Sequence, residues 1–132
     1  MTLVDTNILL DLTGADSLWV AWSEQALDAA AMQGPVCIND VVFAELSVGF
    51  DRLEDCEAVL DGVRITLLPT PRPALFLAGK VFQAYRRRGG TRSGVLPDFF
   101  IGAHAAVADL PLITRDPRRY RSDFPGLLPI CP

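Results

Sequence analysis

The sequence predicts an α/β fold, a three-layer α/β/α sandwich whose central sheet has four to five mainly parallel strands. Short apolar segments of strand length alternate with longer segments of helix length along the whole chain, which is typical of a parallel sheet covered by helices on both faces. Half of the 132 residues are hydrophobic, which is enough for one core and excludes a disordered chain. No repeat or linker interrupts this pattern, so we expect residues 1–132 to form a single domain.

The first quarter of the chain predicts one strand and two helices. Residues 2–5, TLVD, are brief, apolar and contain Val, which favours a buried strand. NILLDLTG, at 7–14, predicts a short helix that ends at its glycine. A longer helix is expected over residues 16–32, with Asp16 or Ser17 as its N-cap and a glycine after its last turn. The residues expected on its buried face are Leu18, Ala21, Trp22, Ala26 and Ala29.

The second quarter repeats the alternation. VCI, at 36–38, predicts a second strand, and the Asn-Asp pair that follows it can cap a helix over 41–50, VVFAELSVGF. Residues 51–62 predict another helix, with its acidic side chains mostly outward. RITLLP, at 64–69, predicts the third strand.

The second half predicts two long helices and two strands. Residues 74–88 have the pattern of a helix whose last turn is cationic, which is favourable for the helix dipole, and GGTRSG at 89–94 predicts a flexible loop. Pro97 opens a helix over 97–109. The remaining elements are expected to be a strand at 111–114, a helical turn at 117–120 and a short strand at 127–130.

Charge is distributed unevenly along the chain. Residues 1–50 contain seven acidic residues and no Lys or Arg, whereas residues 86–132 contain eight Arg against four acidic residues. The net charge of −4 therefore conceals an acidic first part and a basic last part. Such asymmetry fits a polyanionic partner that touches only one face of the molecule.

Several classes of protein are excluded or disfavoured. No apolar run approaches the length that spans a bilayer, and the first residues lack a basic leader, so we expect a cytoplasmic protein with no membrane partner. Cys37, Cys56 and Cys131 are far apart and odd in number, which indicates neither a disulfide framework nor a zinc site. We expect these cysteines to be small core residues.

Four acidic residues are predicted to meet at one edge of the sheet. Asp5 ends the first strand, Asp116 lies two residues beyond the strand at 111–114, and Asp98 lies in the first turn of its helix. Glu45 stands among apolar neighbours inside the helix over 41–50. In open parallel sheets, ligands bind beyond the carboxyl ends of the strands, where these side chains would lie.

Each of these acids also has an ordinary structural explanation. Asp5 can be an N-cap, Asp98 a favourable first-turn charge, Asp116 the start of an Asp-Pro turn, and Glu45 part of an exposed helix face. Together, however, four carboxylates would repel one another unless a cation neutralised them. Oxygen ligands suit Mg²⁺ or Mn²⁺, which can activate a water molecule and stabilise charge on a phosphoryl group. The only histidine, His104, is expected to point away from Asp98.

The late arginines form two clusters, RRRGGTR at 86–92 and RDPRRYR at 115–121. For any one of them a solvated helix end or surface turn is an adequate explanation. As clusters beside an acidic site they suit contacts to the phosphates of RNA, and Tyr85 or Tyr120 could stack on a base. The candidate RNA-binding residues are Arg86, Arg87, Arg88, Arg92, Arg115, Arg118 and Arg119.

Four segments carry a resemblance to a known family. LVDTNILLDL, VVFAELSVG, LPDFFIGAHA and LITRDPRRY, in this order and spacing, resemble the PIN-domain family, particularly the VapC-type toxins of prokaryotic toxin-antitoxin pairs. The resemblance runs from end to end of the chain, and it implies a PIN-like fold. Four ordered motifs are far more specific than any one of them.

The resemblance implies an endoribonuclease that uses Mg²⁺ or Mn²⁺. The carried-over metal-binding and catalytic positions are Asp5, Glu45, Asp98 and Asp116, of which the last is variable in the family; Asn7 and Thr114 match polar positions that support the site. The resemblance also implies hydrolysis by a metal-activated water, a homodimer, and a cognate antitoxin. The helix that contains Trp19 and Trp22 lies in the region that commonly receives the antitoxin.

Two other functions remain open at this point. A non-catalytic RNA-binding or interaction domain of the same family would be expected to lack one of the acids, and none is missing. A phosphatase or receiver-type α/β domain is the second alternative. The phosphatase would need an Asp where Asn7 stands, and the only lysine, Lys80, is badly placed for either. A nucleotide-cofactor domain is disfavoured because the sequence lacks a GxGxxG or Walker pattern.

Overall fold

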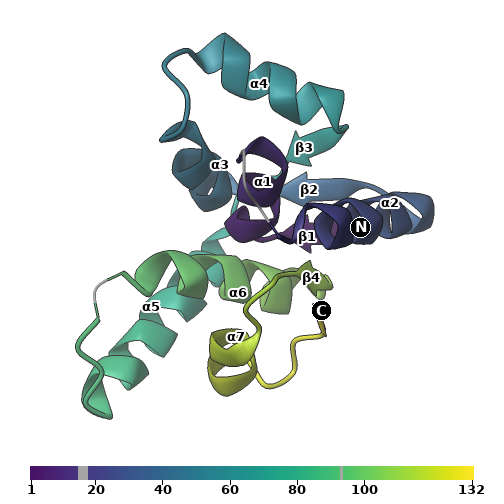
Figure 1. The fold of residues 1–132 in the computed structure, drawn as a ribbon. Coiled ribbons are helices and arrows are strands. Elements are labelled where there is room, and N and C mark those ends of the chain that lie inside the picture. Colours follow the sequence, from purple (N-terminus) through teal and green to yellow (C-terminus); the bar gives the residue numbers. More distant parts are fainter. Residues whose placement is uncertain (15–17, 93) are drawn as a thin grey trace.

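Five parallel strands form the centre of the computed structural model, which describes residues 1–14, 18–92 and 94–132 (Figure 1). The strands are β1 Thr2–Val4, β2 Val36–Ile38, β3 Ile65–Leu67, β4 Leu112–Ile113 and β5 Pro129–Ile130. They lie in the order β3-β2-β1-β4-β5, and each neighbouring pair is parallel. The strand order reverses at β1, so a ligand crevice is expected between the carboxyl ends of β1 and β4.

Helices connect successive strands and cover the sheet, which confirms the predicted three-layer α/β/α class. The helices in the described ranges are α1 Thr6–Thr13, α2 Val20–Gln33, α3 Asp40–Ser47, α4 Leu53–Gly62, α5 Arg72–Arg87, α6 Leu96–Ala108 and α7 Arg118–Asp123. Helix α1 packs against α2 and α3, and α6 packs against α5, α3 and α7. In Figure 1, α5, α6 and α7 form a group on one side of the strands, and α4 lies farthest from them.

The core explains why β1 is central. Thr2, Leu3 and Val4 are all buried, because β1 has a strand on each side and helices over both faces. Large apolar side chains from different layers, including Ile113 of β4 and Phe99 of α6, belong to the same core cluster. Each such side chain contributes about 1.5–3 kcal/mol by leaving water. The packed core therefore holds the carboxyl ends of strands β1 and β4 in fixed positions.

The predicted face of the long second helix is wrong. Leu18, Ala21 and Ala29 are exposed, and the buried residues of α2 are instead Ser23, Leu27 and Ala30. The Ser23 hydroxyl donates a hydrogen bond of 2.7 Å to Asp11 Oδ2, so a polar residue forms part of the buried face. Trp22 and Ala26 are only partly buried and pack at the edge of the core. The proposed caps Asp16 and Ser17 lie outside the described residues.

Smaller expectations have mixed outcomes. Asn39 caps α3 as predicted, because its side chain accepts hydrogen bonds from the backbone N–H groups of Val41 and Val42. Cys37 and Cys56 are buried, but Cys131 is partly exposed near the C-terminal end, so its assignment to the core is wrong. Among the described helices, none has the length and apolar character needed to cross a membrane.

Candidate active site

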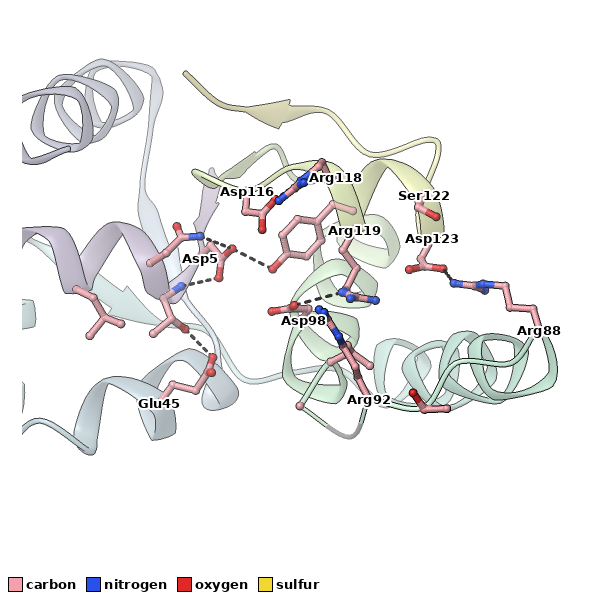
Figure 2. A pocket seen from close by; sticks show the side chains of 17 residues that line it. Asp5, Glu45, Arg88, Arg92, Asp98, Asp116, Arg118, Arg119, Ser122 and Asp123 are labelled. Carbon is pink, nitrogen blue, oxygen red and sulfur yellow. Dashed lines mark hydrogen bonds and ion pairs between the residues drawn. The ribbon is translucent and has the colours of Figure 1, made fainter. Parts of the chain in front are cut away.

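A cavity beyond the carboxyl ends of β1 and β4 contains the four predicted carboxylates (Figure 2). Asp5 directly follows β1, Asp116 lies in the turn after β4, Asp98 is in the first turn of α6, and Glu45 is on α3. Four segments far apart in the sequence thus bring their acidic side chains to one place. His104 does not line this cavity; it is buried in α6.

Asp5 is held by hydrogen bonds to both carboxylate oxygens. It is the N-cap of α1, and its Oδ1 accepts a hydrogen bond of 2.7 Å from the backbone N–H of Thr6. Its Oδ2 accepts from the hydroxyl of Thr114 at 2.7 Å, from the hydroxyl of Tyr120 at 3.0 Å, and from Asn7 Nδ2 at 3.3 Å. Because β1 ends here in the core, the carboxylate is fixed rather than free to change rotamer.

Asn7 and Thr114 also hold the turn that carries Asp116. The Thr114 hydroxyl oxygen accepts from the backbone N–H of Asp116 at 3.1 Å, and Asn7 Oδ1 accepts from the N–H of Arg115 at 3.2 Å. The two side chains are 3.3 Å apart, from Asn7 Nδ2 to Thr114 Oγ1. One polar network therefore connects the end of β1 with the turn after β4.

Thr6 links two of the carboxylates. Its backbone N–H bonds Asp5, and its hydroxyl donates a hydrogen bond of 2.7 Å to Glu45 Oε1. Sequence reasoning missed this role, although a hydroxyl residue directly after a strand-end acid was a usable signal. Tyr120 was also missed as a partner of Asp5, and no local sequence pattern points to it. Only the fold brings α7 to the end of β1.

The charged groups in the cavity perturb one another. Burial raises the pKa of Asp98 to about 6; repulsion from Asp5 adds to this shift, and Arg119 opposes it. Burial also raises the pKa of Asp5, and the hydrogen bonds from Thr114, Tyr120 and Thr6 reduce that increase. Burial and the charges of Asp5 and Asp98 raise the pKa of Tyr120 well above its usual value. The Tyr120 hydroxyl therefore keeps its proton and acts as a donor.

Arginines form the other wall of the cavity. Those that line it are Arg88, Arg92, Arg118 and Arg119. Arg119 lies 3.6 Å from Asp98 Oδ2 and is packed over the rings of Tyr85 and Phe99, at 5.6 and 5.7 Å from their centroids. In Figure 2 its guanidinium group lies beside Asp98. Cations and carboxylates thus share one crevice.

The other three candidate arginines do not line the cavity. Arg86 lies over the ring of Phe82, and Arg115 lies 2.7 Å from the buried Asp11 and over the ring of Trp19. Arg87 is an exposed residue at the end of α5. Tyr120 is 2% exposed, so its ring is not available to stack on a base, and the expectation is wrong for this tyrosine.

The donor set suits a hard cation, but the present positions do not form a closed site. All four acidic groups offer oxygen, and their mutual repulsion, which adds to the effect of burial on the pKa of Asp98, would be relieved by a positive ion. Within the described residues, however, no three His, Cys, Asp or Glu side chains are close enough together to hold a metal ion. Asp98 and Asp116 are instead paired with arginines, Asp116 with Arg118 at 3.3 Å.

Comparisons with solved structures show which proteins share this fold. The VapBC2 complex of Rickettsia felis bound to a promoter DNA fragment is 19% identical, with a TM-score of 0.75 and coverage of 98% of this chain and 97% of that chain. A toxin-antitoxin complex from Klebsiella pneumoniae is 25% identical, with a TM-score of 0.69 and coverage of 97% and 96%. DNA-bound VapBC from Salmonella typhimurium is 21% identical, with a TM-score of 0.71 and coverage of 99% and 98%.

Sequence comparison adds the family assignment. No curated protein sequence matches the chain. The sequence profile of the PIN domain matches residues 2–125, which include the four candidate carboxylates and four of the five described strands, β1 to β4. Since this match spans nearly the whole sequence, the chain belongs to the PIN domain family.

Proposed function

We propose that the chain is a Mg²⁺- or Mn²⁺-dependent endoribonuclease, that residues 1–132 act as one nuclease domain, and that it is the toxin of a toxin-antitoxin pair. One observation carries the proposal: four carboxylates from four separate segments line the same cavity as four arginines. A nuclease needs both, because acidic groups hold the metal and basic groups hold the phosphate backbone. Membership of the PIN domain family supports the same reaction class.

The proposed metal-binding residues are Asp5, Glu45, Asp98 and Asp116. A divalent ion bound there would supply a water molecule of lowered pKa and would stabilise charge on the phosphoryl group. Asp5 and Glu45 are already oriented by hydroxyl and backbone donors, so they need little rearrangement. Because the pKa of Asp98 is about 6, protonation of this carboxyl competes with its role in slightly acidic solution.

The arginines of the cavity are the proposed RNA-binding residues. Arg92 and Arg118 line the cavity from the segment before α6 and from α7. Arg119 is restrained by two aromatic rings and by Asp98, so its guanidinium group is held in place for a phosphate oxygen. Arginine is suited to this task because its planar group donates two parallel hydrogen bonds to phosphate.

Cleavage of RNA by the purified protein tests the nuclease proposal. Wild-type protein with Mg²⁺ or Mn²⁺ is expected to cleave RNA, and EDTA or Asp98→Asn is expected to abolish cleavage. Asp109→Asn is the matched control, since it makes the same charge change at an exposed position at the other end of α6. If wild type and Asp98→Asn cleave equally, the site assignment is wrong. A wild type that binds RNA without cleaving it would favour the non-catalytic alternative.

The proposed partners are an antitoxin protein and a second copy of the chain. The similarity to VapBC complexes supports an antitoxin, because those structures contain a toxin-antitoxin assembly. A small neighbouring gene that encodes a DNA-binding protein is expected beside this one. Its product should block RNA cleavage by the purified chain when the two are mixed at equal concentration. Sedimentation of the chain alone tests whether it is a dimer.

A further inference from the structure

We infer that Tyr120 is a positioning residue that orients the Asp5 carboxylate for a cation through its hydroxyl group. The inference rests on the proposed function, because it concerns the same metal-binding residues. The Tyr120 hydroxyl lies 3.0 Å from Asp5 Oδ2, although the two residues are 115 positions apart in the sequence. The contact therefore depends entirely on how α7 is placed against the end of β1.

The hydrogen bonds to Asp5 are divided unequally between its oxygens. Oδ2 accepts from three side chains, Thr114, Tyr120 and Asn7, whereas within the described part of the chain Oδ1 accepts only from the backbone of Thr6. A carboxylate has about four lone-pair positions, two on each oxygen. The three donors saturate Oδ2, so the acceptor capacity left for a cation is on Oδ1. Tyr120 is one of the three donors that leave Oδ1 as the oxygen available to a cation.

The position of Tyr120 is set by close packing against α6. A Cβ atom at Gly102 would lie 3.1 Å from Tyr120 Cδ1 and 2.6 Å from Phe124 Cδ2, so a side chain there would meet both rings. Gly102 lies four residues after Asp98 and therefore on the same face of α6. The absence of a side chain at this position lets the Tyr120 ring sit deep enough to reach Asp5.

Packing alone does not explain a hydroxyl at this position. The Tyr120 ring is 2% exposed, and a phenylalanine ring would fill the same apolar space. A buried hydroxyl costs free energy unless it is hydrogen-bonded, and Asp5 is the partner that it has here. The hydroxyl thus adds an interaction with the site rather than with the core. Groups that orient metal-binding carboxylates typically change metal affinity or activity by about 10- to 100-fold when removed.

Calorimetric titration with Mn²⁺ of wild type and Tyr120→Phe tests the inference. The variant is expected to bind Mn²⁺ roughly tenfold more weakly, and to cleave RNA with a kcat lowered by a similar factor at unchanged KM. Tyr85→Phe is the matched control for metal binding, because it removes the hydroxyl of the only other tyrosine, which accepts from the Arg92 N–H. That control is expected to change the Mn²⁺ affinity less than about twofold.

Two further results separate the possible failures. If wild type binds Mn²⁺ and cleaves RNA, and Tyr120→Phe binds Mn²⁺ equally well, the inference is wrong and the proposed function stands. If wild type neither binds Mn²⁺ nor cleaves RNA, the proposed function is wrong and the inference falls with it. Should Tyr120→Phe fail to fold, the Mn²⁺ titration is repeated with Gly102→Ala to test the inference. This variant keeps the hydroxyl, but its new Cβ atom would lie 2.6 Å from Phe124 Cδ2 and 3.1 Å from Tyr120 Cδ1, so both rings have to shift. Wild-type Mn²⁺ affinity in this variant overturns the inference.

Discussion

Replacing Asp98 by Asn is expected to stabilise the metal-free protein near neutral pH. Burial and neighbouring carboxylates raise the pKa of Asp98 from 3.8 to about 6, so the folded state disfavours its charged form. Because the folded-state pKa lies above that of the unfolded chain, this penalty is absent below about pH 4. It grows as the pH rises through the folded-state pKa and is complete above about pH 7. An amide carries no such penalty at any pH.

The size of the predicted stabilisation follows from the pKa shift of Asp98 and from the exposure of its side chain. The shift of about 2 pKa units corresponds to about 3 kcal/mol. The Asp98 side chain is 40% exposed, so solvent screening reduces the expected gain to about 1.5 kcal/mol. This value already contains the opposing attraction of Arg119. For a domain of this size, such a gain raises the melting temperature by roughly 5 °C.

Urea unfolding followed by circular dichroism in EDTA, from about pH 4.5 to about pH 7.5, measures the prediction. The difference in unfolding free energy between Asp98→Asn and wild type is expected to be small at the acidic end and to reach about 1.5 kcal/mol at the neutral end. Asp109→Asn changes an exposed residue at the other end of α6, and its difference from wild type is expected not to vary with pH. A difference that does not vary with pH, or a variant less stable at neutral pH, would refute the reasoning.

Two further variants test other contacts of the site and its support. Thr6→Val removes the hydroxyl that holds Glu45, so the rate of RNA cleavage is expected to fall roughly tenfold with RNA affinity unchanged. The control is Thr13→Val on the same helix, which should cleave normally because the Thr13 hydroxyl bonds only the Leu9 carbonyl in the described structure. Equal cleavage rates in both variants would contradict the role of Thr6. Asp11→Ala leaves Arg115 without its buried carboxylate partner, so the unfolding free energy measured in urea is expected to fall by about 3 kcal/mol, and a loss below about 1 kcal/mol would contradict this.

The fold was largely predictable because strand and helix periods are local properties of the sequence. Each apolar run of the predicted strands is a strand in the structure, and all three residues of the central strand β1 are buried. The buried face of α2 was not predictable from hydrophobicity. This face includes the polar Ser23, whose hydroxyl donates a hydrogen bond to Asp11 of α1. A pattern that counts apolar residues cannot identify a face that is held by a polar pair.

For the candidate site too, residues marked by local sequence were predictable, whereas partners brought close only by the fold were not. Asp5, Asp98 and Asp116 were identified because they lie at strand ends or at the start of a helix. A parallel sheet brings such positions to one edge, and in the structure these three residues line one cavity. Their partners were not identified, because Tyr120 reaches Asp5 only through the packing of α7 on α6. Likewise, the sequence clusters grouped Arg115 with the cavity arginines, whereas it pairs with a buried acid on α1.

The partners of the four carboxylates divide the site into a fixed half and an adjustable half. Asp5 and Glu45 are held by hydroxyl and backbone donors, which orient an anion without neutralising it. Asp98 and Asp116 are paired with arginines instead. The pair at Asp116 is exposed, 63% on the acid and 90% on its arginine, and an exposed pair of this kind is worth less than about 1 kcal/mol. Breaking it needs no movement of the core, so Asp116 can exchange Arg118 for another charged group while β1 keeps Asp5 in place.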